Sequence, residues 1–228
     1  MKDSKKYAEK LQKTVRALKR KYGKVDKPKY GLGAQSIVYA VLSQYLSESG
    51  AATAMKKITS HFVDFNELRV SRTDEITDVI GKDTADTRDL ADLMTRTLMA
   101  IFDKYDVVNL EALEEAGKKQ ARAMLEKLIP ESRYVINYVT LTAFDGHAIP
   151  LTSQMLEYLK VNELIHPEAT QEDIEGFLER QIPANSAYEF YALLRKEAES
   201  TMPKKTSATN NNSNHDQNNK AAVKEVKK

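Results

Sequence analysis

Apolar side chains recur along most of the chain at the three-to-four-residue spacing of an amphipathic α-helix. The clearest example is the range 85–105, where one face carries Leu90, Leu93, Met94, Leu98, Ile101, Phe102 and Tyr105. The same spacing predicts an all-α protein with a short turn at 65–68. The predicted helices cover residues 4–23, 34–46, 51–62, 73–80, 85–105, 109–115, 118–129, 132–144, 152–159, 170–178 and 186–199.

Polar residues at the ends of these segments supply start and stop signals. Thr73 and Gly81 bracket one helix, because threonine caps an N-terminus and glycine tolerates the left-handed end of a helix. Thr170 and Asp173 have the spacing of a capping box. Thr152 is expected to cap the helix that follows it, so its hydroxyl has a structural task.

The pattern also predicts how the chain is divided. Residues 1–30 form a basic helix and loop, with helix 4–23 expected to pack with the folded domain over 31–200. From Met202 the composition changes to Lys, Ser, Thr and Asn. A segment with so little apolar surface cannot offset its ordering entropy, so we expect 201–228 to be a disordered tail.

The charge follows the same division. Residues 1–30 contain twelve Lys and Arg and three Asp and Glu, and residues 201–228 contain six and two. The body, 31–200, contains seventeen Lys and Arg against twenty-eight Asp and Glu. DNA binding depends largely on phosphate neutralisation, so the basic arms are better suited to it than the acidic body. A solvated basic helix is the alternative interpretation of the N-terminal arm.

Composition excludes several chemistries. The chain has no cysteine, which excludes disulfides, a cysteine nucleophile and cysteine-ligated zinc or iron–sulfur clusters. Its four histidines lack helical metal-ligand spacing, so neither a metal nor another cofactor is expected. No apolar run approaches the roughly 20 residues that span a bilayer, and the N-terminus lacks a signal-peptide core. We expect a cytoplasmic protein, associated with the nucleoid if it binds DNA.

Two segments carry a family resemblance. Residues 128–155, in register at Asn137 and at 142–144 (Thr-Ala-Phe), form a helix end, a tight hairpin, an apolar helix and a loop. Residues 42–48 read Leu-Ser-Gln-Tyr-Leu-Ser-Glu, close to a Leu-Ser-Gln-Asn-Thr-Ser-Asp signature. Both resemble the helix-hairpin-helix DNA glycosylase superfamily, in its endonuclease III-like branch. The resemblance covers roughly residues 5–200 and implies two helical subdomains with a cleft, in a form without an iron–sulfur cluster.

The resemblance places unusual residues at the catalytic positions. Tyr134 stands where the family has its catalytic lysine, and Thr152 stands where it has its catalytic aspartate. A phenol cannot form the imine that a lyase requires. A neutral hydroxyl cannot offset the positive charge that develops on the sugar during base release. The motif is therefore degenerate, and no catalytic residue is assigned.

The hairpin and its surroundings supply the candidate DNA contacts. Pro130 lacks a backbone N–H and Glu131 adds a negative charge, so phosphate binding at the hairpin should be weak. The remaining candidates are of three kinds. Two are hairpin residues, and two are cations of the preceding helix, for which a solvated face is the alternative interpretation. The last is the glutamine of the signature, which the resemblance places in the DNA stack. They are Ser132, Arg133, Lys118, Lys119 and Gln44.

These observations predict a non-catalytic, endonuclease III-like protein related to base-excision repair. It would bind double-stranded DNA or a repair assembly through its basic arms. One alternative is an active DNA N-glycosylase without lyase activity, whose carboxylate has moved, for instance to Asp145. A second alternative is a helical scaffold that binds only proteins.

Overall fold

The computed structural model describes residues 4–28 and 31–202. Within these ranges the chain is helical, with one isolated bridge between Gly33 and Asn109, so the all-α prediction is confirmed. The helices are α1 (Ser4–Tyr22), α2 (Ala34–Tyr45), α3 (Glu48–His61), α4 (Phe65–Val70), α5 (Thr73–Ile80), α6 (Ala85–Tyr105), α7 (Glu111–Glu114), α8 (Lys118–Leu128), α9 (Arg133–Thr142), α10 (Ser153–Val161), α11 (Gln171–Gln181), the 3₁₀ turn η1 (Ala184–Ser186) and α12 (Ala187–Thr201).

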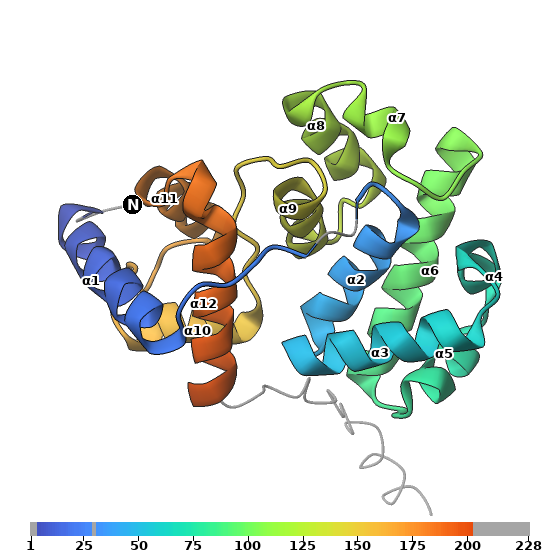
Figure 1. Ribbon diagram of the computed structural model, residues 1–228, viewed down its shortest axis with the longest axis horizontal. Helices are drawn as coiled ribbons and strands as arrows, with labels where there is room; N and C mark the ends of the chain where they lie inside the picture. The colour runs from blue at the N-terminus through green and yellow to red at the C-terminus, as the bar shows by residue number, and fades with distance from the viewer. Residues whose placement is uncertain (1–3, 29–30, 203–228) are drawn as a thin grey trace, which may run out of the picture.

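The helices form two lobes (Figure 1). Helices α2–α8 make the N-terminal lobe, α1 and α10–α12 make the C-terminal lobe, and α9 lies between them. Helix α2 packs against α3, α6 and α9, and nine of its twelve residues are buried. Its apolar sequence therefore makes it the centre of the N-terminal lobe, as its pattern predicted.

Helix α1 lies against α12 although it is far from it in the sequence (Figure 1). Leu11 and Leu18 are buried in this contact. Three lysines of α1 pair with carboxylates of the C-terminal lobe, with N–O distances of 2.6 Å: Lys10 with Glu163, Lys19 with Glu189, and Lys21 with Glu197. Part of the positive charge of α1 is thus neutralised within the fold. The tail expected from residue 203 onward lies outside the described residues.

Some helix ends differ from the predicted ones. Gly81 ends α5 in the left-handed conformation (φ 90°), as expected. Thr73, however, is the first residue of α5 and Arg72 occupies its N-cap without a side-chain bond, so the prediction that Thr73 caps this helix is wrong. Helix α3 begins before residue 51 because Ser47 accepts a hydrogen bond from the Gly50 N–H. The segment at 65–68 is the start of a helix, α4, rather than a turn.

Candidate nucleic-acid interface and interlobe cleft

A cleft of about 560 Å³ lies where the two lobes meet α9. It brings together five residues singled out in the sequence, Gln44, Ser132, Arg133, Tyr134 and Thr152. They come from the end of α2, the hairpin that precedes α9, and the loop before α10. The remaining lining residues are Tyr45, Leu46, Asp86, Glu131, Leu151, Ser153, Gln154, Leu156, Gln171 and Glu199.

The hairpin fixes the first side chains of this cleft. Helix α8 ends at Leu128, and Ser132 is the N-cap of α9, where its hydroxyl accepts a hydrogen bond from the Val135 N–H at 3.1 Å. The same hydroxyl donates to Gln44 Oε1 at 2.6 Å. Ser132 therefore links the start of α9 to the end of α2, and it holds the Gln44 side chain against the hairpin.

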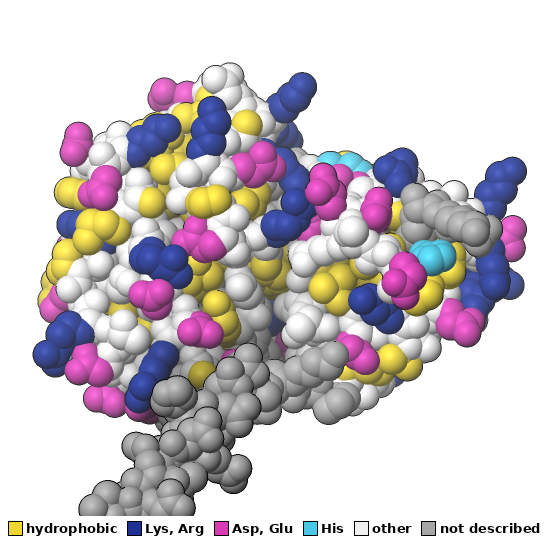
Figure 2. Space-filling view, turned by 180° about the vertical axis from the view of Figure 1, so that it is seen from behind, with side chains coloured by type: hydrophobic (Ala, Val, Ile, Leu, Met, Phe, Trp, Pro, Cys, Tyr) yellow, Lys and Arg dark blue, Asp and Glu magenta, His cyan; other side chains and the backbone are white. Residues whose placement is uncertain are grey.

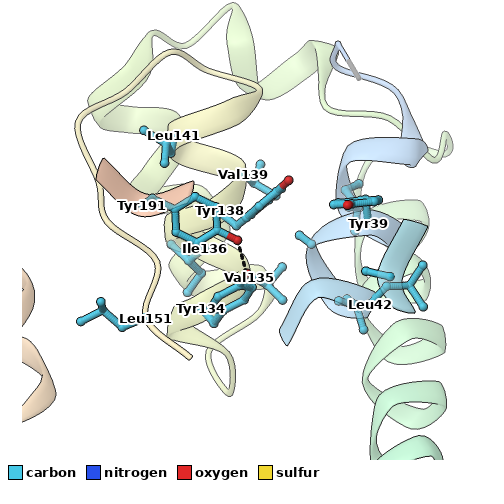
Figure 3. Close-up of a cluster of buried hydrophobic side chains, with 14 of the residues drawn as sticks. Tyr39, Leu42, Tyr134, Val135, Ile136, Tyr138, Val139, Leu141, Leu151 and Tyr191 are labelled. Atoms are coloured by element: carbon cyan, nitrogen blue, oxygen red, sulfur yellow. Dashed lines mark hydrogen bonds between the residues drawn. The ribbon is translucent and has the colours of Figure 1, made fainter. Parts of the chain in front are cut away.

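Tyr134, which the resemblance aligns with the family lysine, points into the protein. Its side chain is 4% exposed, and its hydroxyl lies 2.7 Å from that of Tyr191 on α12 (Figure 3). Arg195 Nη1 donates to the same hydroxyl at 2.8 Å. Burial raises the pKa of the Tyr134 phenol well above its ordinary value, so the group is neutral at physiological pH.

Arg195 is the centre of the polar network beneath the cleft. It is 2% exposed, and its guanidinium donates across the lobe boundary to Ser43 Oγ at 3.1 Å and to the Leu46 carbonyl at 2.8 Å. It also donates to the Tyr191 hydroxyl at 2.6 Å and to Glu199 Oε1 at 2.8 Å. The sequence reasoning missed this arginine. Its signal was the i, i+4 spacing of Tyr191, Arg195 and Glu199, which places three polar-tipped side chains along one strip of α12.

Thr152 takes the role of a helix cap. It precedes α10, and its hydroxyl accepts a hydrogen bond from the Met155 N–H at 3.3 Å. Capping was the structural task predicted for this residue, and the structure confirms it. The carboxylates that do line the cleft are Asp86, Glu131 and Glu199. The last two are engaged by arginines, because Glu131 lies 3.2 Å from Arg96 Nη1 and Glu199 accepts from Arg195.

Arg133 reaches the rim of the cleft but is held by acidic neighbours. Its Nη2 donates to Glu175 Oε2 at 2.7 Å, and the Glu175 side chain is only 3% exposed. Its Nη1 also lies 3.9 Å from Glu172 Oε2. The hydrogen bond to Glu175 raises the pKa of Arg133 above its ordinary value. The cation that the sequence offered to phosphate therefore forms an ion pair within the protein.

The structure does not bring Asp145, Lys118 and Lys119 to the cleft. Asp145 lines a different cavity, at the start of the loop after α9, with its side chain 75% exposed and paired with Lys27. Lys118 Nζ donates to the backbone carbonyl of Asp145 at 2.8 Å, and Lys119 is exposed on α8. Asp145, Lys27 and Lys118 therefore form a separate site, in which the two lysines contact Asp145.

Within residues 4–28 and 31–202 no group of three or more His, Cys, Asp or Glu side chains is placed to hold a metal ion. The helices there are also too short or too polar to cross a bilayer.

Comparison with known proteins places this geometry in a known architecture. No family model and no curated protein sequence matches the chain. A trapped endonuclease III–DNA covalent intermediate superposes with a TM-score of 0.64 at 15% identity, covering 82% of this chain and 84% of that one. H. pylori 3-methyladenine DNA glycosylase bound to 1,N6-ethenoadenine gives 0.62 at 11% identity, covering 86% and 99%.

A third solved structure agrees with these two. Clostridium acetobutylicum 8-oxoguanine glycosylase/lyase, in complex with double-stranded DNA, gives a TM-score of 0.61 at 12% identity, covering 87% of this chain and 71% of that one. Identities this low establish a shared fold. The chain therefore has the two-lobed fold of endonuclease III and related helix-hairpin-helix DNA glycosylases.

Proposed function

We propose that this protein is a non-catalytic relative of the base-excision DNA glycosylases that binds double-stranded DNA. The proposal rests on the identity of two side chains that line the cleft. At the two positions where the resemblance expects a lysine and an aspartate, the side chains are a buried phenol bonded to Tyr191 and Arg195 and a hydroxyl that caps α10.

Neither group has the chemistry of the residue that it replaces. The Tyr134 hydroxyl is buried and neutral, and a phenol cannot form an imine with a sugar aldehyde. The Thr152 hydroxyl carries no charge to stabilise an oxocarbenium-like sugar.

Binding would use the outer face of α1 rather than the cleft. Lys13, Arg16 and Arg20 are exposed at i, i+3 and i+7 on this helix. Within the described part of the chain they have no carboxylate within 4 Å, whereas Lys10, Lys19 and Lys21 are paired. On the face shown in Figure 2, by contrast, basic and acidic side chains are interspersed over both lobes. The tail would add its six lysines.

The test is DNA affinity as a function of salt. We compare the full chain with a Lys13→Gln, Arg16→Gln, Arg20→Gln variant on a 20-base-pair duplex, using fluorescence anisotropy from 50 to 200 mM salt. If each cation contacts one phosphate, the slope of log affinity against log salt becomes shallower by about 2.7. Deleting residues 1–30 is unsuitable because it would remove α1 and expose the surface of α12 against which α1 packs.

The control removes the same charge from the other lobe. Lys56, Lys82 and Lys104 are exposed on or next to α3, α5 and α6, and changing all three to glutamine should leave the slope within about one unit of the parent. Equal slopes in the two variants would refute the role of α1. Undetectable binding at low salt, where charge contacts are strongest, would favour a protein-binding scaffold.

Catalytic activity is tested separately by base release. A panel of damaged duplexes at excess protein should show no product above the uncatalysed rate. Release that is lost in Asp145→Asn would revive the relocated-carboxylate alternative. Release that is lost instead in Glu131→Gln would place the acid in the cleft. Either outcome would overturn the non-catalytic proposal.

A further inference from the structure

The interlobe cleft is acidic. Its lining contributes three carboxylates and one guanidinium, and the ion-pair partners of these groups add two carboxylates and two guanidiniums. Five negative groups therefore accompany three positive ones. The carboxylates are Asp86, Glu131, Glu199, Glu172 and Glu175. This charge disfavours phosphate and favours a cationic occupant.

The C-terminal end of the described chain lies on the rim of the same cleft. Glu199, in the last turn of α12, lines it, and the lining residue Gln154 donates through Nε2 to the Met202 carbonyl at 3.0 Å. The 26 residues after Met202 contain six lysines and two acidic residues. Lys204 and Lys205 are the second and third residues after Met202, and a chain of three residues spans at most about 11 Å.

We propose that the cleft binds the lysine-rich tail of its own chain through Lys204 and Lys205. An ammonium group has three donors, and the cleft offers carboxylates from both lobes together with hydroxyl and amide oxygens. The tail is tethered at the rim, so its effective concentration reaches about the millimolar range. Weak individual ion pairs can therefore give substantial occupancy.

Docking of the tail in the cleft would regulate DNA binding, and this regulatory role rests on the proposed function. Lysines held in the cleft cannot neutralise phosphates, so duplex DNA and the cleft compete for the tail. Docking of the tail can nevertheless be tested without DNA. A failure of docking and a failure of DNA binding are therefore separate results.

The experiment is zero-length carbodiimide cross-linking of the full chain, followed by peptide mass spectrometry. This reagent joins a lysine amine directly to a carboxylate that touches it. Glu199 is too close in sequence to be informative, so the diagnostic links join Lys204 or Lys205 to Asp86 or Glu131 in the other lobe. The pair Lys21–Glu197, at 2.6 Å, serves as an internal positive control.

We expect the diagnostic links at low salt and their loss at 1 M salt, where the Debye length is about 3 Å. Glutamine at both Lys204 and Lys205 should abolish tail links to these two carboxylates, whereas glutamine at Lys227 and Lys228 should leave the diagnostic links in place. Absence of the links while the control pair forms would overturn the proposal. So would tail links made mainly to carboxylates outside the cleft. In a mixture of isotopically light and heavy chains, links found only between the two forms would assign the tail to a second copy, which also overturns it.

Addition of duplex DNA then tests the competition. The diagnostic links should fall with increasing DNA while the Lys21–Glu197 link persists. If the links form but DNA does not reduce them, the cleft binds the tail without regulating DNA binding.

Discussion

The buried arginine gives the most direct test of the network beneath the cleft. Arg195→Met keeps much of the side-chain length but removes the guanidinium that donates to the hydroxyls of Tyr134 and Tyr191. The same guanidinium also donates to Ser43 and Leu46 across the lobe boundary. Removing one member of a buried charged network costs about 3–5 kcal/mol, because its partners stay buried without compensation. Here Tyr134 and Tyr191 can still bond to each other, which lowers the cost.

We therefore expect Arg195→Met to reduce the free energy of unfolding by about 3 kcal/mol, with Tm lower by about 6–12 °C. Urea titration followed by circular dichroism measures the first quantity and calorimetry the second. Arg180→Met, an exposed arginine on α11, is the matched control and should change stability by less than about 0.5 kcal/mol. A loss below about 1 kcal/mol for Arg195→Met would refute the view that this residue joins the lobes.

Three smaller substitutions test local features by the same urea titration. Ser132→Ala removes the cap of α9 and a second hydrogen bond across the cleft, and should cost about 1–2 kcal/mol; a neutral result would mean that water replaces the cap. Gly146→Ala would place a Cβ 2.6 Å from Thr140 Cγ2 and 3.0 Å from its carbonyl oxygen, so about 1–3 kcal/mol should be lost unless this loop can shift. Thr170→Ala removes the hydroxyl of the capping box with Asp173 and should cost about 1 kcal/mol, whereas Thr170→Ser should retain most of the stability.

The helices could be predicted because their signals are local. The apolar stripe of α6 fixed its bounds at residues 85–105, and the left-handed end of α5 falls on Gly81. The ends that were wrong depended on neighbouring residues. Thr73 has capping chemistry, but it is the first helical residue of α5, since Arg72 has the extended backbone of an N-cap. Residue type shows which side chains are able to cap a helix. It does not show at which residue the helix begins.

The residues of the site could be predicted only in the two segments that the resemblance aligns with family motifs. The structure brings Gln44, Tyr134 and Thr152 into one cleft, as the motif alignment implied. Asp145 follows a different path because the Gly146 N–H bonds to the Thr140 carbonyl and closes the end of α9. The chain at Asp145 is left-handed (φ 50°), and its carboxylate pairs with Lys27 outside the cleft.

The contacts of Arg195 within α12 follow from its spacing, but its contacts with other elements could not be predicted because they exist only in the tertiary structure. Its partners come from α2, α9 and α12, which are separated by up to 152 residues in the sequence. A lone arginine on an amphipathic helix is normally solvated, and its charge argues against burial. Only the packing of α12 against the end of α2 supplies enough acceptors to hold a guanidinium there.

Substitutions at positions 134 and 195 should have non-additive effects on the free energy of unfolding. Arg195 Nη1 lies 2.8 Å from the Tyr134 hydroxyl, so a lysine at position 134 would place a second positive charge beside it. Two like charges about 4 Å apart repel by about 4 kcal/mol at an effective dielectric constant of 20. Tyr134→Lys alone should therefore be strongly destabilising, and most of that cost should disappear in the Arg195→Leu background.

A double-mutant cycle measures this link. We expect Tyr134→Lys with Arg195→Leu to be more stable than the sum of the single changes by about 2 kcal/mol or more, whereas additivity within about 0.5 kcal/mol would contradict it. If Tyr134→Lys does not fold alone, recovery of cooperative unfolding in the double variant leads to the same conclusion. A lysine at position 134 would lie beside the buried Arg195 guanidinium, which disfavours both a second charge and an exposed amine there. Tyr134→Lys alone is therefore expected to give no lyase chemistry.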